Sequence, residues 1–150
     1  MPTAPSDLAF RLERVIAAAQ PAVFHAHADP ELLAKWFGPK GFTATSVDVD
    51  LRVGGSYRIE MQPPVGETFC LGGDFREVDP PTRLVYTFRY DDPDPDDRET
   101  TVTFALDDLG SSTRVVVEQG PFATQARLAL HQDGWSDTLD RLEHFVGRRD

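Results

Sequence analysis

Hydrophobic residues recur with a period of two along the middle of the chain and with a helical period over residues 124–146. The helical pattern predicts an amphipathic helix that begins after the N-cap residue Thr124 and ends before Gly147. The residues on its apolar face are Leu128, His131, Trp135, Thr138, Leu142 and Phe145, with Leu139 and Val146 at the margin. The opposite face carries Asp133, Asp137, Asp140, Arg141 and Glu143.

The middle of this helix has less apolar volume than a core helix normally has. His131 and Thr138 are polar where leucine would be expected, and Gly134 lowers the helix propensity by about 1 kcal/mol relative to alanine. Such a face either lets another backbone approach closely or leaves space for a molecule other than protein. The sequence leaves both alternatives open.

Before this helix, the pattern predicts one strand, two short helices and six more strands. The first strand covers residues 8–18, where Arg14 shares the apolar phase, so it either sits at a bulge or reaches inward to a buried acceptor. The helices are residues 21–28 and 30–36. The six strands are residues 43–53, 56–62, 69–78, 83–90, 101–106 and 113–119. In the third of these, Gly72-Gly73 predicts a bulge or a strong bend.

Strands joined by hairpins form an antiparallel sheet with one apolar face, which a long amphipathic helix can cover. We therefore predict a two-layer α+β fold with the element order β-α-α-β6-α. The 150 residues are the length of one ordinary domain. We expect a single domain over residues 1–150, with an ordered core at about residues 8–147.

Charge and composition argue against several classes of function. The formal net charge of −10 argues against DNA or RNA as a partner, because binding to phosphates depends on Lys and Arg. Cys70 is the single cysteine, so no internal disulfide can form. No apolar run reaches the ~20 residues of a membrane span, and residues 1–7 lack the regions of a signal peptide. We expect a cytoplasmic protein, and the abundance of Arg over Lys indicates a GC-rich bacterial source.

The spacing of histidines and carboxylates predicts neither a metal site nor a cofactor. His25 and His27 do not share a helix face, so both are expected on the surface, and His144 is expected to face solvent. Residues 91–97 lack the glycine and the later bidentate Glu of a calcium loop, which favours a solvated hairpin end. No catalytic residue can be assigned. His131 is the best candidate, because histidine titrates near neutral pH.

Four motifs, in order along the chain, resemble those of a known family. Residues 29–42 read D-P-E-L-L-A-K-W-F-G-P-K-G-F and resemble the signature D-P-x-x-L-x-x-W-W-G-P of Hsp90-ATPase-activator-homologue (AHSA1-like) domains, within the START/Bet v 1-like (SRPBCC) superfamily. The other motifs are residues 50–57, similar to D-x-R-x-G-G-x-[WY], residues 75–87, similar to E-[IV]-x-P-P-x-R-L-V-[FY]-T, and residues 134–142, similar to G-W-x-x-x-L-x-x-L. Phe37 stands where a second Trp is usual and keeps an aromatic side chain there.

The resemblance implies the helix-grip fold, in which a seven-stranded curved antiparallel sheet holds the C-terminal helix, with a cavity between them. Apolar and aromatic walls with a few polar groups are typical of small-molecule pockets. We therefore predict a ligand-binding wall formed by Trp36, Phe37, Phe42, Tyr57, Ile59, Met61, Phe69, Tyr86, Phe88, His131, Trp135 and Thr138.

Three functions stay open at this point. The first is binding of a small hydrophobic or aromatic molecule without chemistry, by a monomer or a homodimer. The second is an enzyme of the polyketide cyclase or aromatase type, in which His131, Tyr57, Tyr86 or Arg14 acts in the same cavity. The third is an interaction module for an Hsp90-type chaperone. The eukaryotic cochaperone has another domain ahead of this one, whereas here only residues 1–7 precede the first predicted strand, so we favour ligand binding.

Overall fold

The computed structural model of the protein describes residues 8–147, which form seven strands and three helices. In chain order these are β1 (Phe10–Ile16), α1 (Gln20–Ala28), α2 (Pro30–Trp36), β2 (Thr43–Val49), β3 (Ser56–Gln62), β4 (Phe69–Asp79), β5 (Arg83–Tyr90), β6 (Thr100–Asp108), β7 (Thr113–Gly120) and α3 (Gln125–Val146). The predicted α+β order is confirmed. Residues 1–7, where we expected no signal peptide, lie outside the described residues. Within residues 8–147, no helix is long and apolar enough to cross a membrane.

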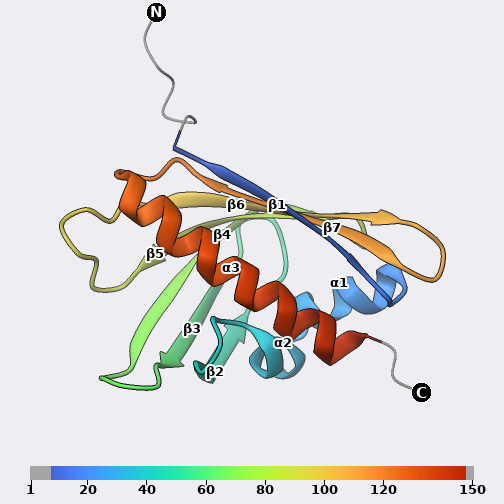
Figure 1. Ribbon diagram of the computed structural model, residues 1–150, viewed down its shortest axis with the longest axis horizontal. Coiled ribbons are helices and arrows are strands. Elements are labelled where there is room, and N and C mark those ends of the chain that lie inside the picture. The colour runs from blue at the N-terminus through green and yellow to red at the C-terminus, as the bar shows by residue number, and fades with distance from the viewer. Residues whose placement is uncertain (1–7, 148–150) are drawn as a thin grey trace, which may run out of the picture.

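The seven strands form one sheet in the order β1-β7-β6-β5-β4-β3-β2, and every neighbouring pair is antiparallel. The sheet curves around α3, which crosses its concave side, while α1 and α2 lie beside the C-terminal half of α3 (Figure 1). This is the helix-grip arrangement. β2 ends at Val49 rather than at residue 53, because residues 50–56 are hydrogen-bonded as a turn.

The predicted bend at Gly72-Gly73 has a different physical basis from a bulge. The register of β4 against β5 shifts between Phe75 and Glu77, two residues beyond the glycine pair. A Cβ atom on Gly73 would lie 2.0 Å from the carbonyl oxygen of Thr87, and one on Gly72 would lie 2.4 Å from that of Tyr57. These positions therefore require glycine because neighbouring backbones approach closely.

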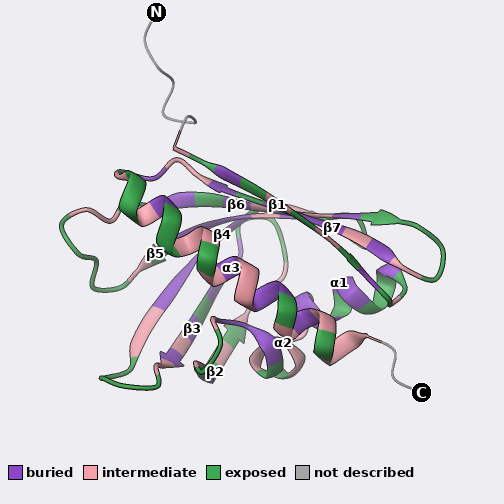
Figure 2. Cartoon of the chain, in the orientation of Figure 1, coloured by how far each residue is buried: buried purple, intermediate pink, exposed green. Residues whose placement is uncertain are grey.

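The predicted inner face of α3 is largely confirmed. Leu128, Trp135, Thr138, Leu139 and Leu142 are buried, and exposed residues occupy the outward side of the helix (Figure 2). The N-cap is also confirmed, since the hydroxyl of Thr124 accepts a hydrogen bond of 3.1 Å from the backbone N–H of Arg127.

The prediction that both histidines of α1 lie on the surface is wrong for His27. His25 is exposed, but His27 is only 6% exposed, and its ring packs edge-on against Trp36, Tyr86 and Phe104. α1 lies against the sheet and α2, so the side of this helix that carries His27 becomes part of the core. His144 is exposed, as predicted.

Arg14 occupies neither of the two environments expected from its phase. It pairs with Val115 in an unbroken antiparallel register, so it is not at a bulge. Its guanidinium lies 2.6 Å from Asp140 and 3.3 Å from Glu143, whose side chains are about half exposed. Arg14 therefore joins β1 to the C-terminal half of α3 at a solvated site.

Candidate functional site

A cavity of about 510 Å³ lies between α3 and the curved sheet. Its apolar wall comes from three regions that are distant in sequence: residues 37–42 after α2, strands β3 to β5, and the N-terminal half of α3. The apolar lining residues are Phe37, Pro39, Phe42, Met61, Pro63, Phe69, Leu71, Phe88, Leu130 and Trp135. This volume is within the usual range for small-molecule sites, roughly 300–1,000 Å³.

The period-two pattern of the strands places these side chains on the same face. Phe69 and Leu71 of β4 point inward together, as do Phe88 and Tyr90 of β5, because alternate residues of a strand share a face. The rings contact one another across the cavity wall, with centroids 6.2 Å apart for Phe42 and Phe69 and 5.8 Å apart for Phe69 and Tyr90. Such edge-on ring contacts hold the wall in a fixed shape.

Gly134 and Thr138 are the residues of small volume on the side of α3 that faces the cavity. A Cβ atom at Gly134 would meet only Pro39, at 3.5 Å, which is an ordinary van der Waals distance. The glycine therefore leaves volume free next to residues 37–42 rather than permitting an obligatory close approach. The hydroxyl of Thr138 donates a 2.7 Å hydrogen bond to the carbonyl oxygen of Gly134, so its polar group is already satisfied within the helix.

Arg141 fixes the position of residues 37–42, which border the cavity. Its Nη1 atom donates to four backbone carbonyl oxygens, those of Phe37, Gly38, Pro39 and Phe42, at 3.0–3.3 Å. Partial burial lowers the pKa of Arg141. The expectation that Arg141 lies on the solvent face of the helix is therefore wrong, because its long side chain reaches back to this loop.

One end of the cavity is polar, and we refer to Tyr90, Asp97, Arg127 and His131 as the polar end. His131 packs between the rings of Phe88 and Phe122, with centroids at 5.3 Å and 5.1 Å. Burial lowers the pKa of His131 to about 4, with a smaller opposing effect of Asp97. Burial likewise raises the pKa of Tyr90 to about 12. Both side chains are therefore uncharged at neutral pH.

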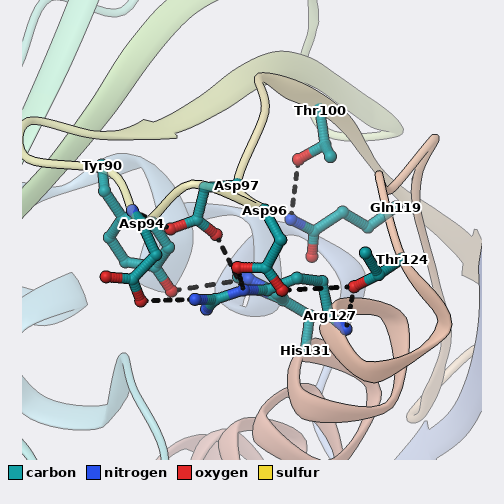
Figure 3. Close-up of polar contacts among 9 residues, drawn as sticks. All are labelled: Tyr90, Asp94, Asp96, Asp97, Thr100, Gln119, Thr124, Arg127 and His131. Carbon is teal, nitrogen blue, oxygen red and sulfur yellow. Dashed lines mark hydrogen bonds and ion pairs between the residues drawn. The ribbon is translucent and has the colours of Figure 1, made fainter.

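The acidic loop after β5 is joined to α3 through Arg127. The guanidinium forms ion pairs with Asp94, with Asp96 at 3.1 Å and with Asp97 at 3.2 Å (Figure 3). Burial lowers the pKa of Arg127, but hydrogen bonds to Asp94 and Asp96 and the charge of Asp97 outweigh this and raise it. The prediction of a solvated hairpin end is correct for residues 91–95, which are exposed, but wrong for Asp97, whose side chain is 9% exposed.

A second network, formed by neutral polar groups, joins Trp135 of α3 to strands β7 and β6. The indole N–H of Trp135 donates to Gln119 at 3.0 Å, and the Gln119 amide donates to the hydroxyl of Thr100 at 3.0 Å. These contacts hold the Trp135 ring in its position on the cavity wall, where its centroid lies 6.0 Å from that of the Phe37 ring. Among residues 8–147, no group of three or more His, Cys, Asp or Glu side chains is arranged to hold a metal ion.

Eight of the twelve predicted wall residues lie on the cavity: Phe37, Phe42, Met61, Phe69, Phe88, His131, Trp135 and Thr138. The other four lie elsewhere. Tyr57, Ile59 and Tyr86 border a much smaller cavity of about 10 Å³. Trp36 is fully buried, and its indole N–H donates to the carbonyl oxygen of Ala26 at 3.0 Å, so its ring belongs to the core between α1 and α2.

Several residues of the cavity were not among the predicted wall residues. Tyr90 has the same strand phase as Phe88 and could have been included on that basis. Arg127 lies four residues before His131, and this helical spacing could have placed it on the same side of α3. No local pattern indicates Asp97, because its position depends on how the loop folds back onto α3.

Several solved structures of bacterial proteins are similar to this chain along nearly its whole length. The protein CV1439 from Chromobacterium violaceum is 30% identical, with a TM-score of 0.84 over 95% of this chain and 99% of that one. NE0264 from Nitrosomonas europaea is 31% identical, with a TM-score of 0.80 over 94% and 95% of the two chains. The AHSA1 protein from Silicibacter pomeroyi is 27% identical, with a TM-score of 0.78 over 91% and 95%.

No curated protein matches the chain significantly. Residues 17–147 match the family described as activator of Hsp90 ATPase homologue 1-like proteins. This match spans α1 through α3, and so includes every element that lines the cavity. The fold, the motifs and this match agree, and the chain belongs to the family of activator of Hsp90 ATPase homologue 1-like proteins.

Proposed function

We propose that the protein binds a small hydrophobic molecule in the cavity between the sheet and α3. The observation that supports this proposal is a cavity of about 510 Å³ with a predominantly apolar and aromatic wall. A folded protein interior normally contains few voids larger than a water molecule. A space of this size is instead typical of small-molecule binding sites.

The cavity is open to solvent, which gives a ligand a route of entry. Leu130 lines it and is 55% exposed, and the neighbouring loop residues Asp91 and Asp92 also border it and are exposed. The dominant favourable term would be removal of apolar ligand surface from water, at about 25 cal/mol per Å². Ligand binding would cost little conformational entropy in the cavity wall, because residues 37–42 and Trp135 are already held in place by hydrogen bonds.

Titration with a fluorescent dye for apolar sites tests this function. We expect the dye to bind, to raise the melting temperature and to change the fluorescence of Trp135, which lies on the cavity wall, whereas Trp36 is enclosed in the core. Gly134→Phe should weaken dye binding at least about tenfold, because the new ring would project into the cavity.

The matched control is Ala129→Phe, which adds the same ring to an exposed position of the same helix. Both variants should keep the circular dichroism spectrum of the wild type. Equal dye affinity in Gly134→Phe and the wild type would show that the dye binds elsewhere, and would contradict the proposal.

A second candidate function is an enzyme of the cyclase or aromatase type in the same cavity. It is favoured by one observation: His131 lies on the cavity wall with its Nε2 atom 3.5 Å from the hydroxyl of Tyr90, so the two groups are placed to move a proton to or from a bound substrate. The reason given for His131 from the sequence, titration near neutral pH, is wrong, because burial lowers its pKa to about 4 and makes the imidazole a weak base. In that case His131→Ala should abolish turnover while dye binding persists. Unchanged turnover would exclude His131 from proton transfer.

Family membership supports a third role, interaction with an Hsp90-type chaperone. We place it after ligand binding, because the cavity is a site with definite dimensions and chemistry, whereas the chaperone role follows only from the family description. A cytoplasmic location fits all three functions. Recovery of a chaperone at stoichiometric amounts with the purified protein would move this role ahead of the others.

A further inference from the structure

We propose that the cavity selects uncharged ligands that carry a hydroxyl or carbonyl oxygen on an aromatic or alicyclic body, and that Tyr90 and His131 bind this oxygen. The inference rests on the proposed function and names the chemical class of its ligand. Three observations carry it: the charges around the cavity, the neutral state of its inner polar groups and the long distance between Tyr90 and His131.

The charges around the cavity disfavour an anionic ligand. Four carboxylates border it, those of Asp91, Asp92, Asp94 and Asp97, and the cation among the described lining residues is Arg127. That guanidinium is 15% exposed and is already surrounded by three carboxylates. A fatty acid or an aromatic carboxylate would therefore approach several like charges without finding a free cation.

The same network also offers no unpaired buried charge for a cationic ligand. Asp97, the buried carboxylate, pairs with Arg127 and accepts a 2.8 Å hydrogen bond from the backbone N–H of Asp94. Asp91 is paired with Arg58 at 2.5 Å. An ammonium group moved into the aromatic interior would lose its hydration and would find the buried carboxylate already paired, which is unfavourable. The unpaired carboxylate among the described lining residues, Asp92, is exposed at the rim of the cavity, where water and salt screen its charge.

Tyr90 and His131 are polar groups that face the cavity with unused hydrogen-bonding capacity. The Tyr90 hydroxyl oxygen and His131 Nε2 are 3.5 Å apart, beyond the usual 2.5–3.2 Å of a good hydrogen bond. Both groups are largely buried and uncharged, so neither is fully hydrated nor fully bonded to the other. A ligand oxygen near both atoms can accept from the phenol and either accept from or donate to the imidazole, according to its tautomer.

Four probes on one aromatic skeleton separate these contributions: naphthalene, 2-naphthol, 2-naphthoate and 2-naphthylmethylammonium, measured at pH 7 by displacement of the dye. We expect 2-naphthol to bind about threefold to tenfold more tightly than naphthalene, which is the factor that one net hydrogen bond gives. The naphthoate and the ammonium compound should both bind more weakly than naphthalene.

Tyr90→Phe should remove the advantage of 2-naphthol over naphthalene and leave the affinity for naphthalene unchanged. Tyr57→Phe is the matched control, because the Tyr57 hydroxyl donates to Thr87 at 2.7 Å and does not line the cavity. It should keep the advantage. Persistence of the advantage in Tyr90→Phe, or tight binding of the naphthoate by the wild type, would overturn the inference.

Releasing Arg127 provides an independent test of the charge argument. In the double variant Asp94→Asn/Asp96→Asn, the guanidinium loses two of its three carboxylate partners, so affinity for the naphthoate should rise several-fold while that for naphthalene stays constant. Asp107→Asn/Asp108→Asn, which removes the same charge at the end of β6, should change neither. An unchanged naphthoate affinity in the first variant would refute the role given to Arg127.

The outcomes also separate this inference from the proposed function. Binding of naphthalene without discrimination among the four probes would leave hydrophobic binding intact and overturn the selectivity. Failure of all four probes and of the dye to bind would overturn both.

Discussion

His27 Nε2 and the hydroxyl of Tyr86 are 2.9 Å apart in the core, where α1 meets the sheet. Both side chains are buried, and the imidazole packs edge-on against Trp36 and Phe104. Burial lowers the pKa of His27 to about 4 and raises the pKa of Tyr86, so the hydrogen bond joins two uncharged groups. This pair links the first helix to the centre of the sheet and makes the fold sensitive to acid.

The free energy of unfolding should therefore fall as the pH decreases from about 6.5 to 4. In this window the unfolded chain, with an ordinary histidine pKa near 6.5, binds a proton that folded His27 does not bind, so acid favours unfolding. The contribution of His27 is on the order of 3 kcal/mol, fully present above pH 6.5 and lost as the pH falls toward 4. Urea unfolding of the wild type at pH 7, 5.5 and 4 measures this contribution together with that of His131, whose pKa burial also lowers to about 4.

His27→Gln isolates this contribution, because the amide can hydrogen-bond to Tyr86 but does not titrate. We expect it to reduce the difference in unfolding free energy between pH 7 and pH 4 by about 3 kcal/mol. His25→Gln, at an exposed position of the same helix, should keep the pH dependence of the wild type. A wild-type pH dependence in His27→Gln would mean that His27 is protonated in the folded protein near pH 6.

Arg141→Met should loosen residues 37–42. Methionine keeps much of the apolar stem but removes the donor that four backbone carbonyl groups share, which should lower the free energy of unfolding by about 1–3 kcal/mol. Hydrogen–deuterium exchange should accelerate at residues 37–42 and stay unchanged in the β6–β7 hairpin. Arg114→Met, which removes an exposed arginine from β7, is the control and should leave exchange at residues 37–42 unaltered.

Arg127→Met should release the loop after β5 from α3. Asp94, Asp96 and Asp97 would then repel one another, and Asp97 would be left largely buried without its counter-ion, at a cost of about 3 kcal/mol or more. The measurements are urea unfolding and hydrogen exchange at residues 91–98. Adding Asp97→Asn should recover part of the loss, whereas Arg89→Met, which breaks an exposed pair with Glu99, should change stability by less than about 1 kcal/mol. A stable Arg127→Met variant with normal exchange would contradict this account of the loop.

The fold could be predicted from the sequence because its signals are local. Alternation in β3 and β5 and helical periodicity in α3 follow from which side of each element is buried, and the turn residues set where strands end. His27 was misplaced because α1 has only nine residues, too few for its pattern to show which side meets the sheet. Arg141 was misplaced because side-chain length, rather than helical position, decides where its guanidinium lies.

The cavity was only partly predictable, for a related reason. Aromatic residues on inward phases include both wall residues and core residues, and the sequence does not distinguish Phe88 from Tyr86 on the same strand. The difference arises from the curvature of the sheet, which brings Tyr86 against α1 and leaves Phe88 facing α3. The ion pair between Asp97 and Arg127 could not be predicted, because it joins distant parts of the chain.

Gly134→Ala should stabilise the protein, whereas Gly73→Ala should destabilise it severely. At Gly134 a methyl group would meet Pro39 at 3.5 Å and replace a helix-disfavouring residue, so the free energy of unfolding should rise by about 0.5–1 kcal/mol. At Gly73 the same methyl group would lie 2.0 Å from the carbonyl oxygen of Thr87, which two neighbouring strands cannot relieve without separating. Thermal and urea unfolding of both variants measure the contrast, and dye binding should persist in Gly134→Ala because a methyl group fills little of the 510 Å³. A destabilised Gly134→Ala variant would show that α3 and residues 37–42 approach each other more closely than an open cavity permits.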